Sequence, residues 1–545
     1  MERIFALLLL TAAVPILDAA ERPNILVLVA DDLGYSDLGV FGSEIRTPNL
    51  DALAHSGTLL TNFHSGVSCG PTRAMLMTGT DNHLVGMGIQ SRPTIPEHIG
   101  NPHYVGYITD EVVSVATLLR DADYHTYMVG KWHLGTEPDK RPSGRGFEHT
   151  FALSGGGASH FSDAHNLFGE DTIYWRDGKE VENLPEDFYS SEFYTDTMID
   201  FIDKGRADSK PFFAYMAYTS VHWPIQVPDN WLNAYKGRYN AGWDVLREER
   251  LTRMKELGII DTDVEAYPRR DDVPAWDDLS PLAKQVEARK MELYAAMVEN
   301  LDFHMGRVIE YLKRTGQYDN TFIIFMSDNG AEGNNIGGMY DNPYWLPATF
   351  DNRIANMGRI RSYLWMGPGW TQVSSLPHRM WKAYVSEGGI TVPAFVTWPG
   401  LQSKGGRSDV MTTVMDVLPT ALELAGAKHP GPRYNGRTIL EPRGRSMLAH
   451  LRGEQSDVHG PEYANGWEAQ GRNAFRKGDW KILWLWEPFG PDRWELFNLA
   501  EDPGETRDLS YREPEKLAEL LAGWDEYVKT TGIVVLDRDE GYGRK

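Results

Sequence analysis

Asn24 to Ala30 form an uninterrupted, almost entirely apolar run that is followed at once by two aspartates, Asp31 and Asp32. A strand without alternating polar residues is one that other elements cover on both faces. Comparable runs recur at 124–132, 211–218 and 321–327. Helical patterns lie around these runs, at 48–56, 111–121, 191–204, 282–315 and 416–425. The alternation predicts an α/β fold with a mostly parallel central sheet sandwiched by helices.

The pattern changes after about residue 430. Short alternating strands are predicted at 473–476, 480–486 and 494–498, and a last helix is predicted at 514–530. We therefore expect two parts: a large α/β domain at 21–430 and a smaller C-terminal α+β subdomain with an antiparallel sheet at 431–545.

The first twenty residues differ from the rest of the chain. Arg3 supplies a basic start, residues 4 to 17 are mostly apolar, and the small residues Ala19 and Ala20 follow. This order is typical of a cleavable secretory signal, so residues 1–20 predict export to the periplasm or the cell exterior. The apolar run is too short to span a bilayer, and no longer one follows it, so we expect no membrane partner.

The charge of the chain limits its partners further. It has 77 Asp and Glu residues against 54 Lys and Arg residues, which gives a net charge of −23. Such a charge repels nucleic acid and anionic membrane surfaces, so neither is an expected partner. An anionic substrate would need a strong local positive site.

Carboxylates and an amide follow two of the predicted strands. Asp31 and Asp32 come directly after the first strand, and Asp328 and Asn329 come directly after the strand at 321–327. Either motif alone would more often be a turn or a helix cap. Together they predict an oxygen-rich site for a hard cation, Ca²⁺ or Mg²⁺. The absence of sulfur and imidazole from this set disfavours a zinc phosphatase.

Cys69 is the only cysteine of the chain, and it stands in the sequence Cys69-Gly70-Pro71-Thr72-Arg73. It can form neither an intramolecular disulfide nor a multi-cysteine metal site. Pro71 suits the first turn of a helix, which places Cys69 at a helix N-terminus, with Arg73 one turn on. An isolated cysteine is more often a buried small hydrophobic residue than a reactive one.

Further cationic and imidazole side chains follow the predicted strands. Lys131 and His133 end the strand at 124–132, and their spacing predicts that both project from one face. His222 follows the strand at 211–218. Lys382 is the weakest candidate, because its spacing alone favours an exposed surface lysine.

Five motifs in one order carry a resemblance to a known family. They are Asp31-Asp32-Leu33-Gly34, Cys69-Gly70-Pro71-Thr72-Arg73, Gly130-Lys131-Trp132-His133-Leu134-Gly135, His222-Trp223-Pro224 and Ser327-Asp328-Asn329-Gly330. From Arg22 to about residue 530 the chain resembles the type I, formylglycine-dependent sulfatases of the alkaline-phosphatase superfamily. Glu387-Gly388-Gly389-Ile390 and the segment 441–446 are most similar to the bacterial arylsulfatases.

The resemblance implies a role for each candidate residue. A maturation enzyme would convert Cys69 to formylglycine (3-oxoalanine), whose hydrate attacks the sulfur of a small-molecule sulfate ester. Arg73 and Lys131 would hold the formylglycine hydroxyl, and His133 would take its second proton. His222 and Lys382 would bind sulfate oxygens and assist the departing alcohol. One Ca²⁺ would be held by Asp31, Asp32, Asp328, Asn329 and the modified Cys69.

The substrate is less constrained than the chemistry. Aryl sulfates are favoured by aromatic residues in the stretch 330–375, which we expect to form a rim: Tyr340, Tyr344, Trp345, Tyr363, Trp365 and Trp370. Sulfated carbohydrates are an alternative. So is a phosphonate monoester or phosphodiester hydrolase with the same nucleophile. The least favoured hypothesis is an inactive exported protein that binds sulfated glycans, because none of the expected site residues is missing.

Overall fold

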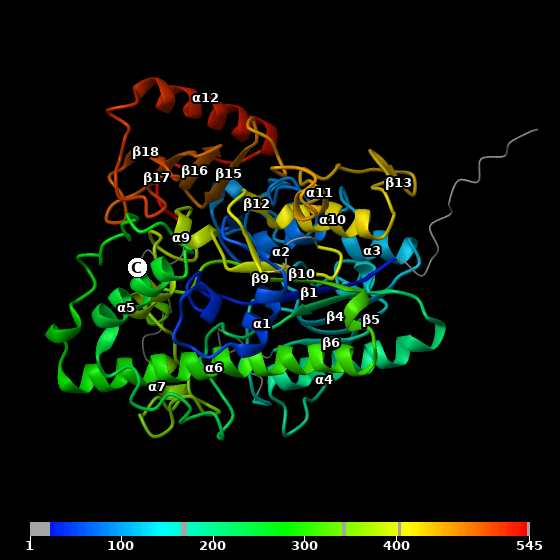
Figure 1. The fold of residues 1–545 in the computed structure, drawn as a ribbon, viewed down its shortest axis with the longest axis horizontal. Helices are drawn as coiled ribbons and strands as arrows, with labels where there is room; N and C mark the ends of the chain where they lie inside the picture. The colour runs from blue at the N-terminus through cyan, green and yellow to red at the C-terminus, as the bar shows by residue number, and fades with distance from the viewer. Residues whose placement is uncertain (1–21, 164, 166–171, 340–344, 402–404, 542–545) are drawn as a thin grey trace, which may run out of the picture.

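One large sheet runs through the middle of the molecule (Figure 1). The computed structural model describes residues 22–163, 165, 172–339, 345–401 and 405–541, so the predicted signal segment lies outside the described residues. Within them the sheet has ten strands, in the spatial order β11 (Gly406–Ser408), β2 (Thr58–Leu60), β10 (Ala394–Thr397), β9 (Thr321–Ser327), β1 (Asn24–Ala30), β8 (Phe212–Ala217), β4 (His125–Lys131), β5 (His149–Leu153), β6 (Tyr174–Arg176) and β7 (Lys179–Glu180).

The centre of this sheet is parallel, as the sequence predicts. β9, β1, β8, β4 and β5 run in one direction, whereas β10 is antiparallel to both of its neighbours and β6 and β7 add an antiparallel edge. The register pairs Ala30 with Ser327 and Val29 with Ala217. The three central strands therefore end at the same level, and the residues that follow them meet at one edge.

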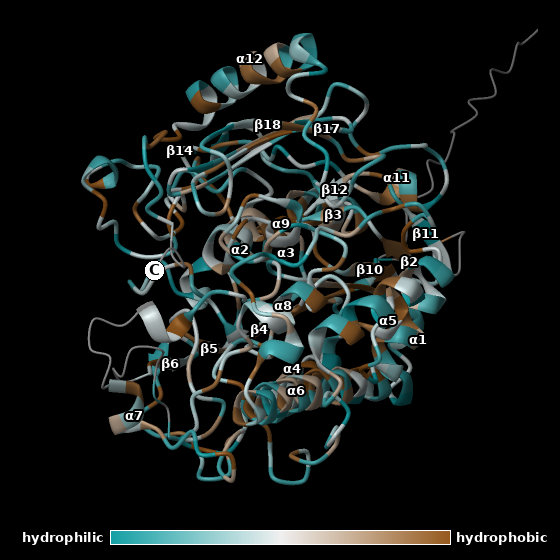
Figure 2. Cartoon of the chain, turned by 90° about the vertical axis from the view of Figure 1, so that its left-hand side faces the viewer, coloured by the Kyte–Doolittle hydropathy of each residue, from teal (hydrophilic) through white to brown (hydrophobic). Residues whose placement is uncertain are grey.

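The apolar run of β1 is explained by two cores. Ile25, Val27 and Val29 point into one core, and the residues between them point into the other. One face is covered by α1 (Pro48–Ser56), α4 (Ser190–Gly205) and α6 (Pro281–Arg314), and the other by α2 (Cys69–Thr78), α3 (Val115–Asp121) and α10 (Val417–Leu424). Figure 2 shows that α6 carries both hydrophilic and hydrophobic residues, as expected of a helix that covers a core on one side.

The predicted helices are confirmed with small shifts at their ends. α3 begins at Val115 rather than at residue 111, because the hydroxyl of Ser114 caps it by accepting a bond from the backbone N–H of Thr117. α6 begins at Pro281 after a similar cap by Ser280. Among the described residues, no helix combines the length and the apolarity needed to cross a bilayer.

The C-terminal part forms the expected antiparallel sheet, with strands β15 (Ala464–Ala469), β16 (Arg472–Lys477), β17 (Trp480–Leu485) and β18 (Arg493–Asn498) and the covering helix α12 (Pro514–Thr531). β15 was not predicted, because polar residues interrupt its apolar pattern. Ile439 and Leu448, which follow residue 430, pack into the core around α2 and α10. The domain boundary near residue 430 stays a prediction.

The remaining elements are short or lie at the rim. They are β3 (Phe63–His64), β12 (Thr412–Thr413), β13 (Arg433–Tyr434), β14 (Arg437–Thr438), α5 (Gly242–Glu256), α7 (Trp345–Thr349), α8 (Pro368–Ser374), α9 (Glu387–Ile390) and α11 (Leu448–Leu451).

A buried charged cluster joins the C-terminal sheet to the α/β domain. The ring of His83 lies between two carboxylates, with Nδ1 3.2 Å from Asp81 and Nε2 3.3 Å from Glu468 of β15. The Tyr527 hydroxyl of α12 donates to Asp81, and the Tyr104 hydroxyl donates to Glu468. Burial alone would lower the pKa of His83, but the hydrogen bonds to the two carboxylates raise it to about 9.

We expect His83→Gln to lower the free energy of unfolding by on the order of 3 kcal/mol near pH 6. The pKa of His83 rises from 6.5 in the unfolded chain to about 9 in the fold. Its contribution is therefore complete below pH 6.5 and is lost as the pH rises through about 9. Urea unfolding at several pH values should show the gap between the variant and the parent narrowing over this range.

His304→Gln is the matched control. His304 lies buried on α6, and its pKa is lowered to about 3, mainly by burial, so it stays neutral over the same range. The cost of His304→Gln should not change between about pH 7.5 and pH 9.5, where this histidine is neutral in the unfolded chain as well as in the fold. A cost of His83→Gln that is equally constant would contradict the role of the charged cluster.

Candidate active site

The loops after three parallel strands are tied together at the carboxyl edge of the sheet. The backbone N–H of Asp31, after β1, donates to the carbonyl of Ser220, after β8, over 2.9 Å. The N–H of Asp32 donates to Oδ1 of Asp328, after β9, over 3.3 Å. The N–H of Leu33 donates to the hydroxyl of Ser327 over 3.0 Å. These bonds gather the predicted carboxylates at one point.

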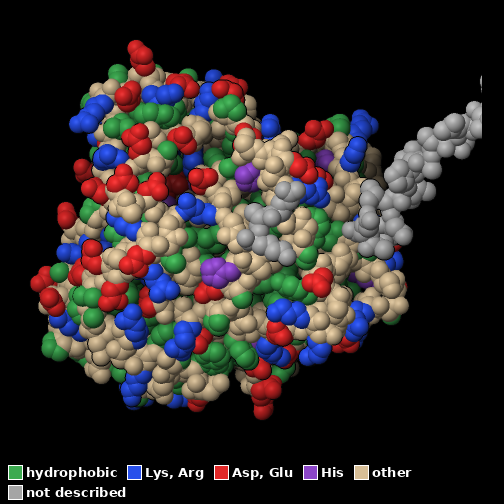
Figure 3. All heavy atoms as spheres, in the orientation of Figure 1, with side chains coloured by type: hydrophobic (Ala, Val, Ile, Leu, Met, Phe, Trp, Pro, Cys, Tyr) green, Lys and Arg blue, Asp and Glu red, His purple; other side chains and the backbone are tan. Residues whose placement is uncertain are grey.

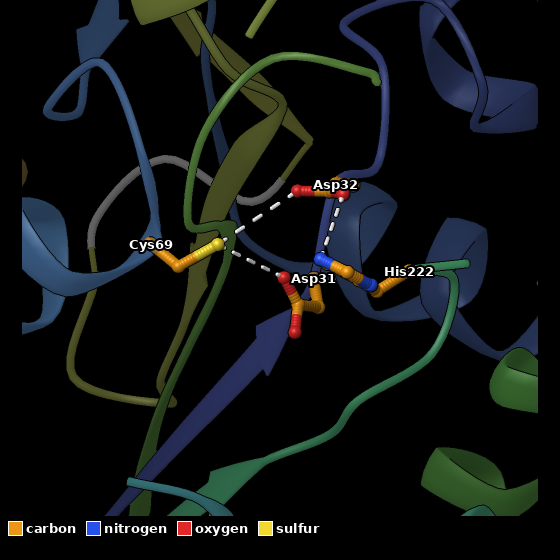
Figure 4. Close-up of side chains that lie close together, drawn as sticks. All are labelled: Asp31, Asp32, Cys69 and His222. Atoms are coloured by element: carbon orange, nitrogen blue, oxygen red, sulfur yellow. Dashed lines mark hydrogen bonds and ion pairs between the residues drawn. The ribbon is translucent and has the colours of Figure 1, made fainter. Parts of the chain in front are cut away.

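Cys69 is the first residue of α2, as predicted, and its side chain points into this group (Figure 4). Its Sγ lies 3.5 Å from Oδ1 of Asp31 and 4.0 Å from Oδ1 of Asp32, and the residue is 2% exposed. Burial and the charge of Asp328 raise the pKa of the thiol. An unmodified Cys69 is therefore a protonated thiol and not a thiolate nucleophile.

Three buried cations face the three carboxylates. Arg73 donates from Nε and Nη2 to Oδ2 of Asp328, over 3.0 and 2.7 Å. The Nζ of Lys131 lies 2.7 Å from Oδ2 of Asp31. The third cation, Lys382, lies 2.7 Å from Oδ1 of Asp32.

The position of Lys382 differs from what its spacing alone favoured and agrees with the place that the resemblance implies. Its spacing favoured an exposed lysine, but the residue is 2% exposed. The chain between α8 and α9 folds back over the strand ends, where the N–H of Lys382 donates to the carbonyl of Ala331. Only this fold-back brings the lysine to the site.

The carboxylates respond differently to their surroundings. Burial raises the pKa of Asp31 to about 7, with Asp328 adding to the rise and Lys131 opposing it. Burial also raises the pKa of Asp328, but Arg73 and Lys131 together bring it below its ordinary value. A further cation at this point would favour the charged forms of all three carboxylates.

His222 lies in the loop after β8, next to Asp32. Its Nδ1 is 2.6 Å from the carbonyl oxygen of Trp223, and its Nε2 is 3.6 Å from Oδ2 of Asp32. Burial, Lys382 and Lys131 hold the pKa of His222 well below its ordinary value. A carbonyl oxygen only accepts, so Nδ1 carries the proton of the neutral ring and Nε2 presents a lone pair.

His133 reaches the site by a different route from the one predicted. β4 ends at Lys131, and His133 has a φ of 58°, so the alternation of a strand does not apply to it. Its Nδ1 is buried with no hydrogen-bond partner among the described residues. Burial, Lys131, Arg73 and Lys382 hold its pKa well below the ordinary value, so its ring lies in the field of the site cations.

The oxygen cluster fits a hard cation. Nδ2 of Asn329 donates to Oδ1 of Asp32 over 2.7 Å, while its Oδ1 is buried without a hydrogen-bond partner in the described part of the chain. A buried amide oxygen without a donor is uncommon, and a cation would satisfy it. Three carboxylates and this amide are the donor set that Ca²⁺ prefers.

Sequence reasoning missed residues that support the cations. The Tyr215 hydroxyl of β8 lies 3.4 Å from Nη1 of Arg73. Glu332 lies 3.7 Å from Nζ of Lys382. Glu332 comes three residues after Asn329 in the sequence, and this proximity to a predicted site residue was the one indication that Glu332 could belong to the site. The sequence gives no such indication for Tyr215, because it stands in an apolar run that predicts a buried strand.

The predicted aromatic rim is confirmed only in part. Tyr340 and Tyr344 lie outside the described residues. Trp370 is a core residue instead, because it packs against Trp243 and Trp276. Tyr363 forms a small cluster together with Trp223, Trp345, Phe350 and Trp365. The ring of Trp223 lies 4.9 Å from that of His222, so this cluster adjoins the site.

The face of the molecule seen in Figure 3 adds little to the attraction of an anion. On the face seen in Figure 3, acidic and basic side chains are interspersed, without a continuous basic patch. In a chain with a net charge of −23, the buried cations Arg73, Lys131 and Lys382 supply the positive charge next to the oxygen cluster.

Comparisons with known proteins match nearly the whole chain. The Sulfatase family model matches residues 23–427, and a model described as N-sulphoglucosamine sulphohydrolase, C-terminal, matches residues 378–525. An uncharacterized sulfatase of Schizosaccharomyces pombe is 42% identical over 533 residues, which cover 95% of this chain and 96% of that protein. An arylsulfatase of Klebsiella aerogenes is 40% identical over 434 residues, which cover 79% of this chain and 92% of that protein. The crystal structure of Ps i-CgsB in complex with k-i-k-neocarrahexaose is 27% identical, with a TM-score of 0.66 over 93% of this chain and 92% of that one.

Proposed function

Because this chain belongs to the sulfatase family, whose reaction is the hydrolysis of sulfate esters, we propose that it acts on aryl sulfates with formylglycine at position 69 and one Ca²⁺. The observation that carries this proposal is the environment of Cys69. Its thiol is buried against two carboxylates, and its pKa is raised by burial and by Asp328. The site favours an oxygen nucleophile on this residue over a thiolate.

Formylglycine accounts for the groups around position 69. Its hydrate supplies two hydroxyls on one carbon, one to attack sulfur and one whose loss of a proton expels sulfate as the aldehyde re-forms. Arg73 and Lys131 lie beside this position, paired with Asp328 and Asp31, and we assign them to orienting the hydroxyls. His133 is neutral and keeps a buried Nδ1 without a partner among the described residues, so it can accept the proton.

We assign the metal to the oxygen cluster. Asp31, Asp32, Asp328 and Asn329, with the modified Cys69, would hold Ca²⁺, which supplies Lewis acidity and charge stabilisation at a sulfate oxygen. The orphaned Oδ1 of Asn329 and the all-oxygen donor set support this assignment.

We assign His222 and Lys382 to the sulfate and the departing alcohol oxygen. Lys382 contributes a buried positive charge beside Asp32. The resting His222 keeps its proton on Nδ1, so Nε2 must take up a proton before it can donate one. The negative charge of a bound sulfate ester favours this protonation.

We propose that activity also depends on processing of the chain. We propose that residues 1–20 direct export to the periplasm or the exterior, and that a maturation enzyme of the host modifies Cys69. The basic start and apolar run of the N-terminus support export. The sequence Cys69-Gly70-Pro71-Thr72-Arg73 supports modification.

Two classes of sulfate ester are candidates for the substrate. The arylsulfatase of Klebsiella aerogenes and the aromatic cluster around Trp223 favour aryl sulfates. The likeness to Ps i-CgsB, solved with k-i-k-neocarrahexaose, makes sulfated carbohydrate the second candidate. Aromatic contacts contribute about 0.5–1.5 kcal/mol each, enough to separate the two classes kinetically.

We expect kcat/KM for 4-nitrophenyl sulfate to exceed that for a sulfated carrageenan hexasaccharide by at least about tenfold. The aromatic cluster next to His222 would stabilise a planar alcohol group. Initial rates measured with both substrates check this, and 4-nitrophenyl phenylphosphonate serves as a third substrate. Faster turnover of the hexasaccharide would reverse the substrate assignment, and faster turnover of the phosphonate would favour a phosphonate monoester hydrolase.

We expect peptide mass spectrometry of active protein to find formylglycine at position 69. Cys69→Ala should abolish turnover of 4-nitrophenyl sulfate, by about 10⁴-fold or more, because the nucleophile is lost. Its thermal unfolding should stay close to that of the parent, since Cys69→Ala removes a single buried atom. Full activity in protein that contains only unmodified cysteine would refute the mechanism.

We expect removal of Ca²⁺ to lower both activity and stability. At a free concentration about 100 times its Kd, a bound ion adds about 2.7 kcal/mol, or a Tm increase of about 2 °C in a chain of this size. Dialysis against a chelator, checked by metal analysis, should remove this increase, and Ca²⁺ should restore it. Asn329→Ala keeps all three carboxylates and should need more Ca²⁺ for the same Tm. Metal-free protein with unchanged Tm and activity would exclude the assignment.

A further inference from the structure

A second buried histidine, His160, lies directly behind His222, and none of the motifs above contains it. Its Nε2 is 3.1 Å from the backbone carbonyl oxygen of His222, and its Nδ1 is 2.7 Å from the hydroxyl of Ser190, the first residue of α4. The ring is 1% exposed. It therefore connects the start of α4 to the loop that carries His222.

The protonation of His160 follows from its partners. A carbonyl oxygen only accepts, so Nε2 must carry a proton and donate it to His222. Burial lowers the pKa of His160 to about 4, and the bond to the His222 carbonyl only partly opposes this, so the ring is neutral at neutral pH. Nδ1 then accepts from the hydroxyl of Ser190. Both ring nitrogens are used in one tautomer.

His160 is itself held on both sides by its backbone. Its N–H donates to Oε1 of Gln226 over 2.9 Å, and its carbonyl accepts from the N–H of Ser190 over 2.9 Å. Gln226 in turn donates from Nε2 to the carbonyl of Ser362. A ring fixed in this way can define the position of the group to which it donates.

The segment 156–160 also reaches the other histidine of the site. A Cβ added to Gly156 would lie only 3.0 Å from Cε1 of His133. The backbone at Gly156 therefore lies close against the ring of His133, while His160 holds the loop of His222. One segment contacts both histidines that we assign to proton transfer and sulfate binding.

We propose that His160 is a positioning residue for His222. In the described part of the chain, the His222 carbonyl has no donor other than His160. Without this bond the carbonyl is a buried acceptor that lacks a partner, which costs about 1–3 kcal/mol unless the loop moves. A shift of about 1 Å at a reacting group costs up to about 100-fold in rate. The proposal rests on the catalytic role assigned to His222.

The test compares two variants of similar size. The Nε2 of a glutamine can take the place of Nε2 of His160, whereas the shorter side chain of asparagine reaches only toward Ser190. We expect His160→Asn to lower kcat by at least about tenfold with little change in KM, and His160→Gln to stay within about threefold of the parent. The loss in His160→Asn should be larger for phenyl sulfate than for 4-nitrophenyl sulfate, because phenoxide is the poorer leaving group and depends more on His222.

Further variants separate positioning from general loss of structure. His304→Gln removes an equally buried neutral histidine on α6 and should leave kcat unchanged. Ser190→Ala removes only the bond to Nδ1 of His160 and should cause a milder loss of kcat. It takes the place of His160→Asn in the test if that variant fails to fold. The proposal is refuted if His160→Asn and His160→Gln lose equal amounts of kcat in proportion to their losses in Tm. It is also refuted if a folded His160→Asn keeps the kcat of the parent. If His160→Asn does not fold, an unchanged kcat in Ser190→Ala refutes it.

His222→Ala distinguishes this failure from that of the proposed function. If His222→Ala loses activity while His160→Asn keeps it, the positioning role alone is wrong. If His222→Ala keeps full activity, the catalytic role assigned to His222 is wrong, and the role of His160 is wrong with it.

Discussion

The arrangement of the site depends on three buried carboxylates that are each opposed by a buried cation. Arg73 holds Asp328, Lys131 holds Asp31, and Lys382 holds Asp32, with closest contacts of 2.7 Å. Charges this deeply buried are tolerated only when they are paired and hydrogen-bonded, and the removal of one partner typically costs about 3–5 kcal/mol. Each pair joins two different segments of the chain. The ion pairs therefore hold the strand ends, α2 and the loop before α9 in one arrangement.

The C-terminal subdomain stabilises two of these segments from outside. The indole of Trp467 on β15 donates to the carbonyl of Ser65, four residues before Cys69. Arg472 on β16 donates to the carbonyl of Ala383, next to Lys382, over 2.7 Å. Ala383 in turn donates to the carbonyl of Val67. In Figure 1 the small sheet lies over this end of the molecule, so it acts as a support for the nucleophile and for one of the cations.

Much of the fold could be predicted because local patterns reflect burial directly. The apolar run of β1 required cover on both faces, and two separate cores supply it. The errors arose where tertiary contacts override local pattern. The sequence of β15 has a polar pattern, and its Glu468 is buried in contact with His83 and Tyr104, which lie far away in the sequence. Trp370 was expected at a rim, but indole contacts from α5 and from the segment at Trp276 place it in the core.

The amino-acid sequence by itself determined the family, the parallel sheet and the gathering of Asp31, Asp32 and Asp328, because parallel strands end at one edge and these residues follow those strands directly. Only the tertiary structure decided which cation pairs with which carboxylate. Lys382 meets Asp32 across 350 residues of sequence, and His160 meets His222 through a loop without regular structure. No local pattern encodes such contacts, since they depend on how separate loops pack against each other after the sheet has formed.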